Sequence, residues 1–150
     1  MSTLFDAISA AADLDAALGV IIFHFKADSG TIHFMDSPNM LRLRAASKGI
    51  PAPVLDVIRT VPVGKGMAGL AAQRREPVTV CNLQTDASGN VRPGARATGL
   101  EGAIVVPIFD GENVVGTLGI ANRNERTFTK EETDLLIECG RGIVQFAKTK

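Results

Sequence analysis

The sequence contains no tryptophan and no tyrosine, and its 150 residues carry 16 basic and 16 acidic side chains. Proteins that hold single-stranded nucleic acids usually combine aromatic stacking platforms with a positively charged groove. A chain without surplus positive charge lacks the electrostatic footprint of a nucleic-acid-binding protein. We therefore expect no nucleic acid among its partners.

A long apolar segment is also missing. No uninterrupted apolar run is longer than that of Val20–Phe23, whereas a bilayer-spanning helix needs about 20 residues. The first residues, Met1–Ala7, lack the basic start and apolar stretch of a secretory signal peptide. We therefore expect a cytoplasmic protein with no membrane partner, and its length fits a single domain over residues 1–150.

Cysteine and histidine are scarce. Cys81 and Cys139 form no CxxC pattern, so free thiols are expected. Neither His24 nor His33 has an acidic residue or a cysteine at metal-ligand spacing, so we expect no metal site. His33 has two interpretations: a structural histidine with a satisfied ring, or a side chain that donates to a ligand or binds a haem.

Capping residues and apolar spacing predict helices at both ends of the chain and two shorter helices between them. Thr3 is the expected cap of the first helix, Asp13 caps the second, and Thr129–Glu132 form a capping box for the last. The expected helices begin at Thr3 and then cover about 14–27, 53–60, 66–73 and 129–148.

Alternating and β-branched residues predict five strands, over 31–36, 40–47, 78–81, 102–109 and 114–122. Regular alternation in the strand over 40–47 predicts one apolar and one solvent-facing side. Pro62 is expected to end the helix before it, and Asp110-Gly111 predicts a hairpin turn with a loop longer than two residues. Adjacent strands with tight turns favour an antiparallel sheet with the terminal helices on one face.

Residues 84–99 contain almost no apolar side chains. A connection of this length within a compact domain is usually a binding loop or a disordered segment. Arg92 and Arg96, with Asp86, either close over an anionic ligand through charge-assisted hydrogen bonds or lie on a solvated loop. Both interpretations stay open at the level of sequence.

Three signatures follow one another in the second half of the chain. They are a turn that runs into a helix (Val61–Gly69), a strand that ends in a turn (Gly102–Asn113) and its partner strand (Val114–Asn122). Together they resemble a GAF domain. The resemblance implies an α+β, three-layer sandwich that is GAF/PAS-like. A central antiparallel sheet has the N- and C-terminal helices on one face, and short helices plus a long loop cover a ligand pocket on the other.

The resemblance also implies the chemistry of the pocket. The pocket of cyclic-nucleotide-binding members is similar in place to Thr31, Ala46, Ser47, Met67, Ala68 and Thr98, and Gly119 stands where some members use an acidic residue. Strand alternation adds His33 and Thr117 to the pocket face. A family signature appears as Asn122-Arg123…Phe128-x3-Glu132-Thr133, which has the structural interpretation of a basic–acidic tether between the last strand and the last helix.

The implied function is a small-molecule-binding sensory or regulatory module of signal transduction, not an enzyme. It would act through a homodimer or a signalling partner protein. A stripe of small and apolar residues in the last helix favours the homodimer: Leu136, Gly140, Ile143 and Ala147. A second stripe consists of Leu4, Phe5 and Ile8.

Two other functions stay open. One is a thiol-dependent reductase similar to GAF enzymes that reduce free methionine sulfoxide, although 84–99 contains no cysteine. The other is a structural dimerisation domain without an open pocket. Gly64-Lys65-Gly66 lacks the spacing of a phosphate loop and predicts a tight turn. The Cys-His pair at which GAF domains attach a bilin is missing, so neither metal, haem nor bilin is indicated as a cofactor.

Overall fold

The computed structural model describes residues 2–80, 82 and 99–147. Within them the chain forms five helices: α1 (Ser2–Ser9), α2 (Leu14–Phe25), α3 (Ala52–Ile58), α4 (Gly66–Arg74) and α5 (Lys130–Ala147). Six strands accompany them: β1 (Ser29–Ser37), β2 (Met40–Ala46), β3 (Thr60–Pro62), β4 (Val78–Val80), β5 (Gly102–Asp110) and β6 (Asn113–Asn122). In this part of the chain no helix is both long enough and apolar enough to cross a membrane.

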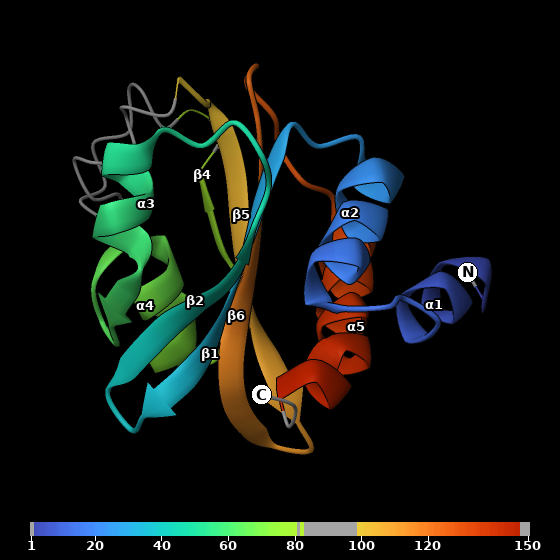
Figure 1. The fold of residues 1–150 in the computed structure, drawn as a ribbon. Helices are drawn as coiled ribbons and strands as arrows, with labels where there is room; N and C mark the ends of the chain where they lie inside the picture. Colours follow the sequence, from blue (N-terminus) through green and yellow to red (C-terminus); the bar gives the residue numbers. More distant parts are fainter. Residues whose placement is uncertain (1, 81, 83–98, 148–150) are drawn as a thin grey trace.

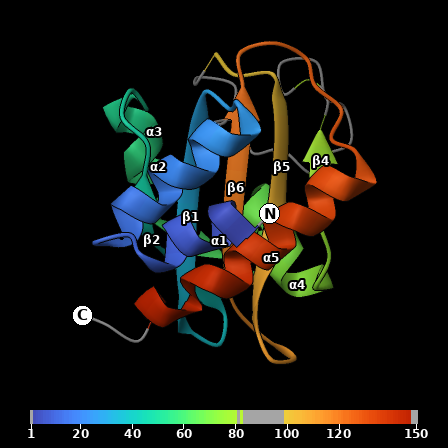
Figure 2. The same ribbon diagram turned by 90° about the vertical axis from the view of Figure 1, so that its right-hand side faces the viewer.

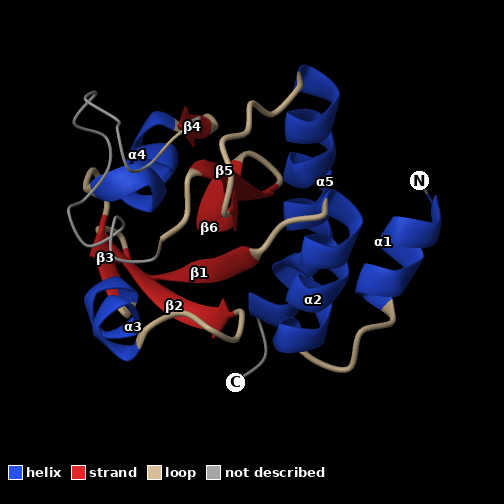
Figure 3. Ribbon diagram, turned by 90° about the horizontal axis from the view of Figure 1, so that it is seen from above, coloured by secondary structure: helices blue, strands red, loops and turns tan. Residues whose placement is uncertain are grey.

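The six strands form one antiparallel sheet in the order β3-β2-β1-β6-β5-β4. Figure 1 shows the sheet between two layers of helices, with α1, α2 and α5 on one side and α3 and α4 on the other. We call these the helix face and the cavity face of the sheet. The view from above shows the same three layers (Figure 3). The predicted α+β sandwich is confirmed.

The main core lies on the helix face. Ile32, Leu118 and Ile120 of the central strands are at most 2% exposed and pack with the apolar sides of the terminal helices. Figure 2 looks onto this layer, where α2 and α5 lie across the strands. Figures 1 and 3 show α1 outside these two helices, away from the sheet.

The predicted dimer stripe belongs to this core. Leu136 is 1% exposed and Ile143 is 0% exposed, while a Cβ on Gly140 would lie 3.5 Å from the Ile108 side chain. The stripe therefore packs within the chain, because α5 needs it to cover the sheet. The prediction that it forms an exposed interface is wrong.

The second stripe is also largely buried. Leu4 is 6% exposed and Ile8 is 0% exposed, because α1 uses them to pack on the other terminal helices. Phe5 is only partly buried. The homodimer itself stays a prediction, now without the surfaces that the sequence assigned to it.

Strand β2 does not alternate regularly. Ile32 pairs with Ala45 and His33 pairs with Leu43, so Arg44 is an extra residue in a β-bulge. The bulge turns Ala45 towards the core of the helix face, whereas Leu41 packs with Val61 on the cavity face. The predicted simple alternation over 40–47 is wrong for this reason.

Three local predictions also differ from the structure. Thr3 lies inside α1, which begins one residue earlier. The short strand β3 includes Pro62, and an edge strand tolerates proline because one side of it needs no ladder hydrogen bonds. Asp110 pairs with Asn113, so the hairpin loop has two residues and is not longer.

Arg126 joins the end of α2, the end of β6 and the start of α5. Its Nη1 donates to the Phe25 carbonyl and to Asn122 Oδ1, each at 2.8 Å. Its Nη2 donates to Glu132 Oε2 at 2.6 Å, and the guanidinium lies 4.4 Å from the centre of the Phe128 ring. This arrangement is the basic–acidic tether that the sequence predicted, with a different basic residue.

Arg123 is not the cation of the tether. Its side chain is exposed, and its backbone N–H donates to Asp28 Oδ2 at 2.7 Å. Arg126 can take this place because residue 102 is a glycine. A Cβ at Gly102 would lie 2.6 Å from the backbone nitrogen of Arg126. Only glycine leaves room for the chain at Arg126 to fold back against β5.

The predicted capping box completes the tether. Glu132 N–H donates to Thr129 Oγ1 at 3.1 Å, and Thr129 N–H donates to Glu132 Oε1 at 2.9 Å. The Thr129 backbone bond first, and then Arg126, hold the pKa of the Glu132 carboxyl below its usual value. One carboxylate thus serves both the helix cap and the arginine.

We expect Arg126→Met to lower the free energy of unfolding by about 2–3 kcal/mol, because it leaves the Glu132 carboxylate, the Phe25 carbonyl and Asn122 Oδ1 without their donor. The matched control is Lys130→Met, which removes the exposed Lys130–Asp134 pair of α5. That change should have little effect on the free energy of unfolding, because exposed ion pairs are well solvated. Urea denaturation measures both, and equal losses in the two variants would contradict a special role of Arg126.

Candidate ligand-binding site

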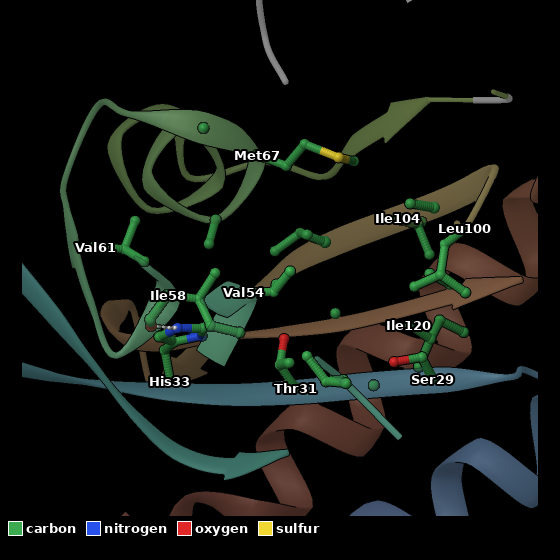
Figure 4. A pocket seen from close by; sticks show the side chains of 18 of the residues that line it. Ser29, Thr31, His33, Val54, Ile58, Val61, Met67, Leu100, Ile104 and Ile120 are labelled. Atoms are coloured by element: carbon green, nitrogen blue, oxygen red, sulfur yellow. Dashed lines mark hydrogen bonds between the residues drawn. The ribbon is translucent and has the colours of Figure 1, made fainter. Parts of the chain in front are cut away.

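A cavity of about 170 Å³ lies between the cavity face of the sheet and the helices α3 and α4. Figure 4 shows β1 as its floor, with β5 and β6 behind and the start of α4 above. Apolar side chains dominate its walls within the described part of the chain, namely Ile50, Val54, Val57, Ile58, Val61, Met67, Leu100, Ala103, Ile104, Val105, Ile120 and Ala121.

Strand β1 contributes three polar side chains to the lining of this cavity. Ser29, Thr31 and His33 line the cavity, whereas Ile32 and Phe34 pack into the core of the helix face. The separation follows from the two-residue period of a strand. Figure 4 shows the Thr31 hydroxyl pointing up from the floor. No hydrogen bond of this hydroxyl is found among the described residues.

The start of α4 forms the opposite wall. Gly64 and Gly66 have φ values of +96° and +64°, which confirms the predicted tight turn. Gly64 N–H donates to the Gly69 carbonyl at 2.8 Å, and Gly69 N–H donates to the Lys65 carbonyl at 3.0 Å. The turn thereby places Lys65 and Met67 against the cavity.

His33 is the most deeply buried polar residue of the described lining, with 3% of its surface exposed. Its Nε2 lies 2.8 Å from the Ile58 carbonyl oxygen, which can only accept. We therefore assign the proton to Nε2, which leaves Nδ1 with a free lone pair. Burial lowers the pKa of His33 from 6.5, and the Ile58 hydrogen bond opposes this effect only in part, so the ring is neutral at pH 7.

One ring nitrogen of His33, Nε2, therefore has a structural role. The Nε2–H group ties the floor strand β1 to the end of α3 in the roof (Figure 4). Nδ1 has no partner among the described residues. The buried hydroxyl of Thr117, the cross-strand neighbour of His33, makes no hydrogen bond within that part of the chain and does not occupy Nδ1.

The structure brings together some of the predicted pocket residues: Thr31, His33, Met67, Ala68 and Gly119 all line the cavity. Ala46, Ser47 and Thr117 do not belong to its described lining, which corrects their predicted place. Arg92, Arg96 and Thr98 lie outside the described residues, as does the predicted loop over 84–99 except for Gly99.

Each of these corrections has a local reason. Ser47 Oγ lies 3.0 Å from Ser29 Oγ and accepts from Gly30 N–H at 3.0 Å, so it supports the wall from behind. Ala46 pairs with Thr31 on the neighbouring strand β2, outside the lining. Thr117 lies on the cavity face but is 1% exposed, because α4 packs onto β6.

The family resemblance implied that short helices cover the pocket, but sequence reasoning assigned no residue of α3 to it. Val54, Val57 and Ile58 of α3 line the cavity, and Val57 is 41% exposed at the same time. Their i, i+3, i+4 spacing is that of one helix face, which is a signal the sequence contains. That spacing does not show which face of the sheet the helix covers.

The one described cysteine is remote from the cavity. Cys139 lies on α5, in the core of the helix face, and is 0% exposed. Burial raises the pKa of its thiol to about 12. Cys81 lies outside the described residues. Within the described ranges, no cluster of three His, Cys, Asp or Glu side chains is placed to hold a metal ion.

The profile of the GAF domain family matches residues 3–146, and the chain belongs to this family. The fold is similar to the GAF domain of a phosphoenolpyruvate-protein phosphotransferase from Acinetobacter, with a TM-score of 0.77 and 18% identity over 97% of this chain and 88% of that one. No curated protein matches the chain.

Two further solved structures differ in activity. Free methionine-R-sulfoxide reductase from Neisseria meningitidis, in complex with its substrate, has a TM-score of 0.77 and 17% identity over 97% of this chain and 85% of that one. A domain assigned to a two-component sensor histidine kinase of Sinorhizobium meliloti has a TM-score of 0.69 and 17% identity over 89% of this chain and 88% of that one. GAF domains are commonly sensory or regulatory modules, and this fold also occurs in enzymes.

The lowered pKa of His33 predicts a pH-dependent stability. Above pH 6.5 the ring is neutral in both states and the full stability is present. As the pH falls from 6.5 towards the lower folded pKa, the unfolded chain binds more protons, so the free energy of unfolding falls by up to about 1.4 kcal/mol per pH unit.

Urea denaturation at several pH values measures this slope. His33→Phe should flatten it in that window, and His24→Gln, a change at an exposed histidine, is the control. A wild-type slope that survives His33→Phe would assign the titration to another group.

Proposed function

We propose that the protein is a small-molecule-binding sensory module of signal transduction, which acts through self-association or a partner protein. The observation that carries the proposal is the cavity of about 170 Å³ between the sheet and α3 and α4. Pockets of this kind, largely apolar with a few convergent polar groups, are the usual sites for small ligands. Thr31 and His33 supply those polar groups here.

The sheet offers a route from the cavity to the terminal helices. Strands β1 and β6 line the cavity on one face and pack against α2 and α5 on the other. Along β1, cavity residues such as Thr31 and His33 alternate with core residues such as Ile32. A ligand that shifts these strands therefore changes the packing of the terminal helices, which is the kind of differential contact that a signalling response requires.

The similar domain assigned to a sensor histidine kinase supports this signalling role by fold. The similar methionine sulfoxide reductase favours an enzyme instead. Thiol chemistry needs an accessible thiolate, whereas Cys139 is buried on the opposite face of the sheet and has a pKa raised to about 12. We therefore prefer the sensory function.

Filling the cavity should abolish ligand binding. Ala121 lines the cavity, and Ala121→Ile adds bulk there. A compound found by thermal-shift screening at about 100 times its Kd stabilises the wild type by about 2.7 kcal/mol. That stabilisation should disappear in Ala121→Ile and persist in Ala7→Ile, the same change at an exposed position of α1. Undiminished binding by Ala121→Ile would place the ligand elsewhere.

Reductase activity is tested separately. We expect no thiol-dependent reduction of free methionine sulfoxide by the wild type, because the one described thiol is protonated and buried. The measurement is turnover with a dithiol reductant, in parallel with the Cys81→Ser/Cys139→Ser double variant. Turnover that the double variant loses would overturn the sensory proposal in favour of the enzyme.

A further inference from the structure

We propose that this cavity selects a small neutral molecule with an apolar body of about one ring and an O–H or N–H group that donates to Nδ1 of His33. Phenol is the simplest compound of this class. The inference rests on the proposed function, since it concerns the same cavity, and adds the chemical class of the ligand.

The size of the cavity supports a single ring. An engineered apolar cavity of about 150 Å³ in another protein binds benzene, and the cavity here measures about 170 Å³. Its described walls consist mainly of aliphatic side chains, including Val54 and Ile58 of the roof and Val105 and Ala121 of the sheet. An apolar ring replaces water at such walls without loss of hydrogen bonds.

The charge of the described lining favours a neutral ligand. Lys65 is the one charged side chain in that lining, and it is exposed. Moving an ion from water into an apolar site is unfavourable unless a buried partner compensates it. A carboxylate would have to remain near Lys65, away from the apolar walls.

His33 determines the hydrogen-bond preference. Its Nε2–H is committed to the Ile58 carbonyl at 2.8 Å, so the nitrogen that remains can only accept. The neighbouring Thr117 hydroxyl makes no hydrogen bond within the described residues, so Nδ1 is not satisfied from that side. A ligand that donates gives Nδ1 a hydrogen-bond partner inside the cavity, and an acceptor-only ligand does not.

The decisive comparison is phenol against toluene, which have the same shape and number of heavy atoms. In a purely apolar cavity toluene binds more tightly than phenol, because phenol must lose the hydrogen bonds between its hydroxyl group and water. We expect the wild type to reverse this order and to bind phenol at least tenfold more tightly than toluene. Titration followed by amide NMR shifts gives both constants, with shifts expected at Thr31, His33 and Met67.

Variants locate the preference. His33→Phe removes the acceptor and should restore the order with toluene first, whereas His24→Phe, the same change at an exposed histidine, should leave the wild-type order. The wild-type comparison stands even if His33→Phe fails to fold. Benzoate is the anionic probe and should bind at least tenfold more weakly than phenol.

The outcomes separate this inference from the proposed function. Tighter binding of toluene or benzoate by the wild type, with loss in Ala121→Ile, overturns the phenol-like class and leaves a ligand-binding cavity. Failure of all three probes to bind also overturns the inference, and the thermal-shift screen then decides the proposed function independently. Phenol binding that Ala121→Ile leaves unchanged places phenol outside the cavity and overturns the inference, and the thermal-shift screen again decides the proposed function.

Discussion

The guanidinium of Arg126 is the contact on which the arrangement of the terminal helices depends. It donates to the last residue of α2, to the last residue of β6 and to the third residue of α5, and it lies over the Phe128 ring. Charge-assisted bonds in such partly shielded surroundings are stronger than exposed ion pairs. With both helices fixed on the same face of the sheet, the other face is left to α3 and α4 and to the cavity they cover.

The sheet therefore has two unlike faces made by one set of strands. On β1 the period of two residues sends Ile32 to the core and Thr31 and His33 to the cavity. The bulge at Arg44 gives β2 the same two faces. Without it, Ala45 would lie on the same face as Leu41, four residues earlier, but the bulge turns Ala45 to the core of the helix face. The large core supplies the stability, and a face that contributes less packing is free to hold a cavity.

Much of this fold was predictable because its signals are local. Asp13 accepts from Ala16 N–H at 2.8 Å as the expected cap of α2, and the capping box of α5 is formed as written in the sequence. Contacts between distant segments were not predictable in the same way. The burial of Ile143, the choice of Arg126 over Arg123 and the bulge at Arg44 each depend on what lies across the fold. For the same reason the sequence located the floor of the cavity at Thr31 and His33 but assigned none of the α3 residues that form its roof.

The His33 ring lines the cavity and also donates a hydrogen bond to Ile58 of the roof helix α3. A change in the electron density of this ring therefore affects both. Imidazole is polarisable, and a proton donated to Nδ1 withdraws electron density from the ring and makes the Nε2–H group a stronger donor, as in other cooperative hydrogen-bond chains. With the proposed ligand bound, the hydrogen bond from His33 to Ile58 strengthens, so this one side chain couples the content of the cavity to the attachment of α3.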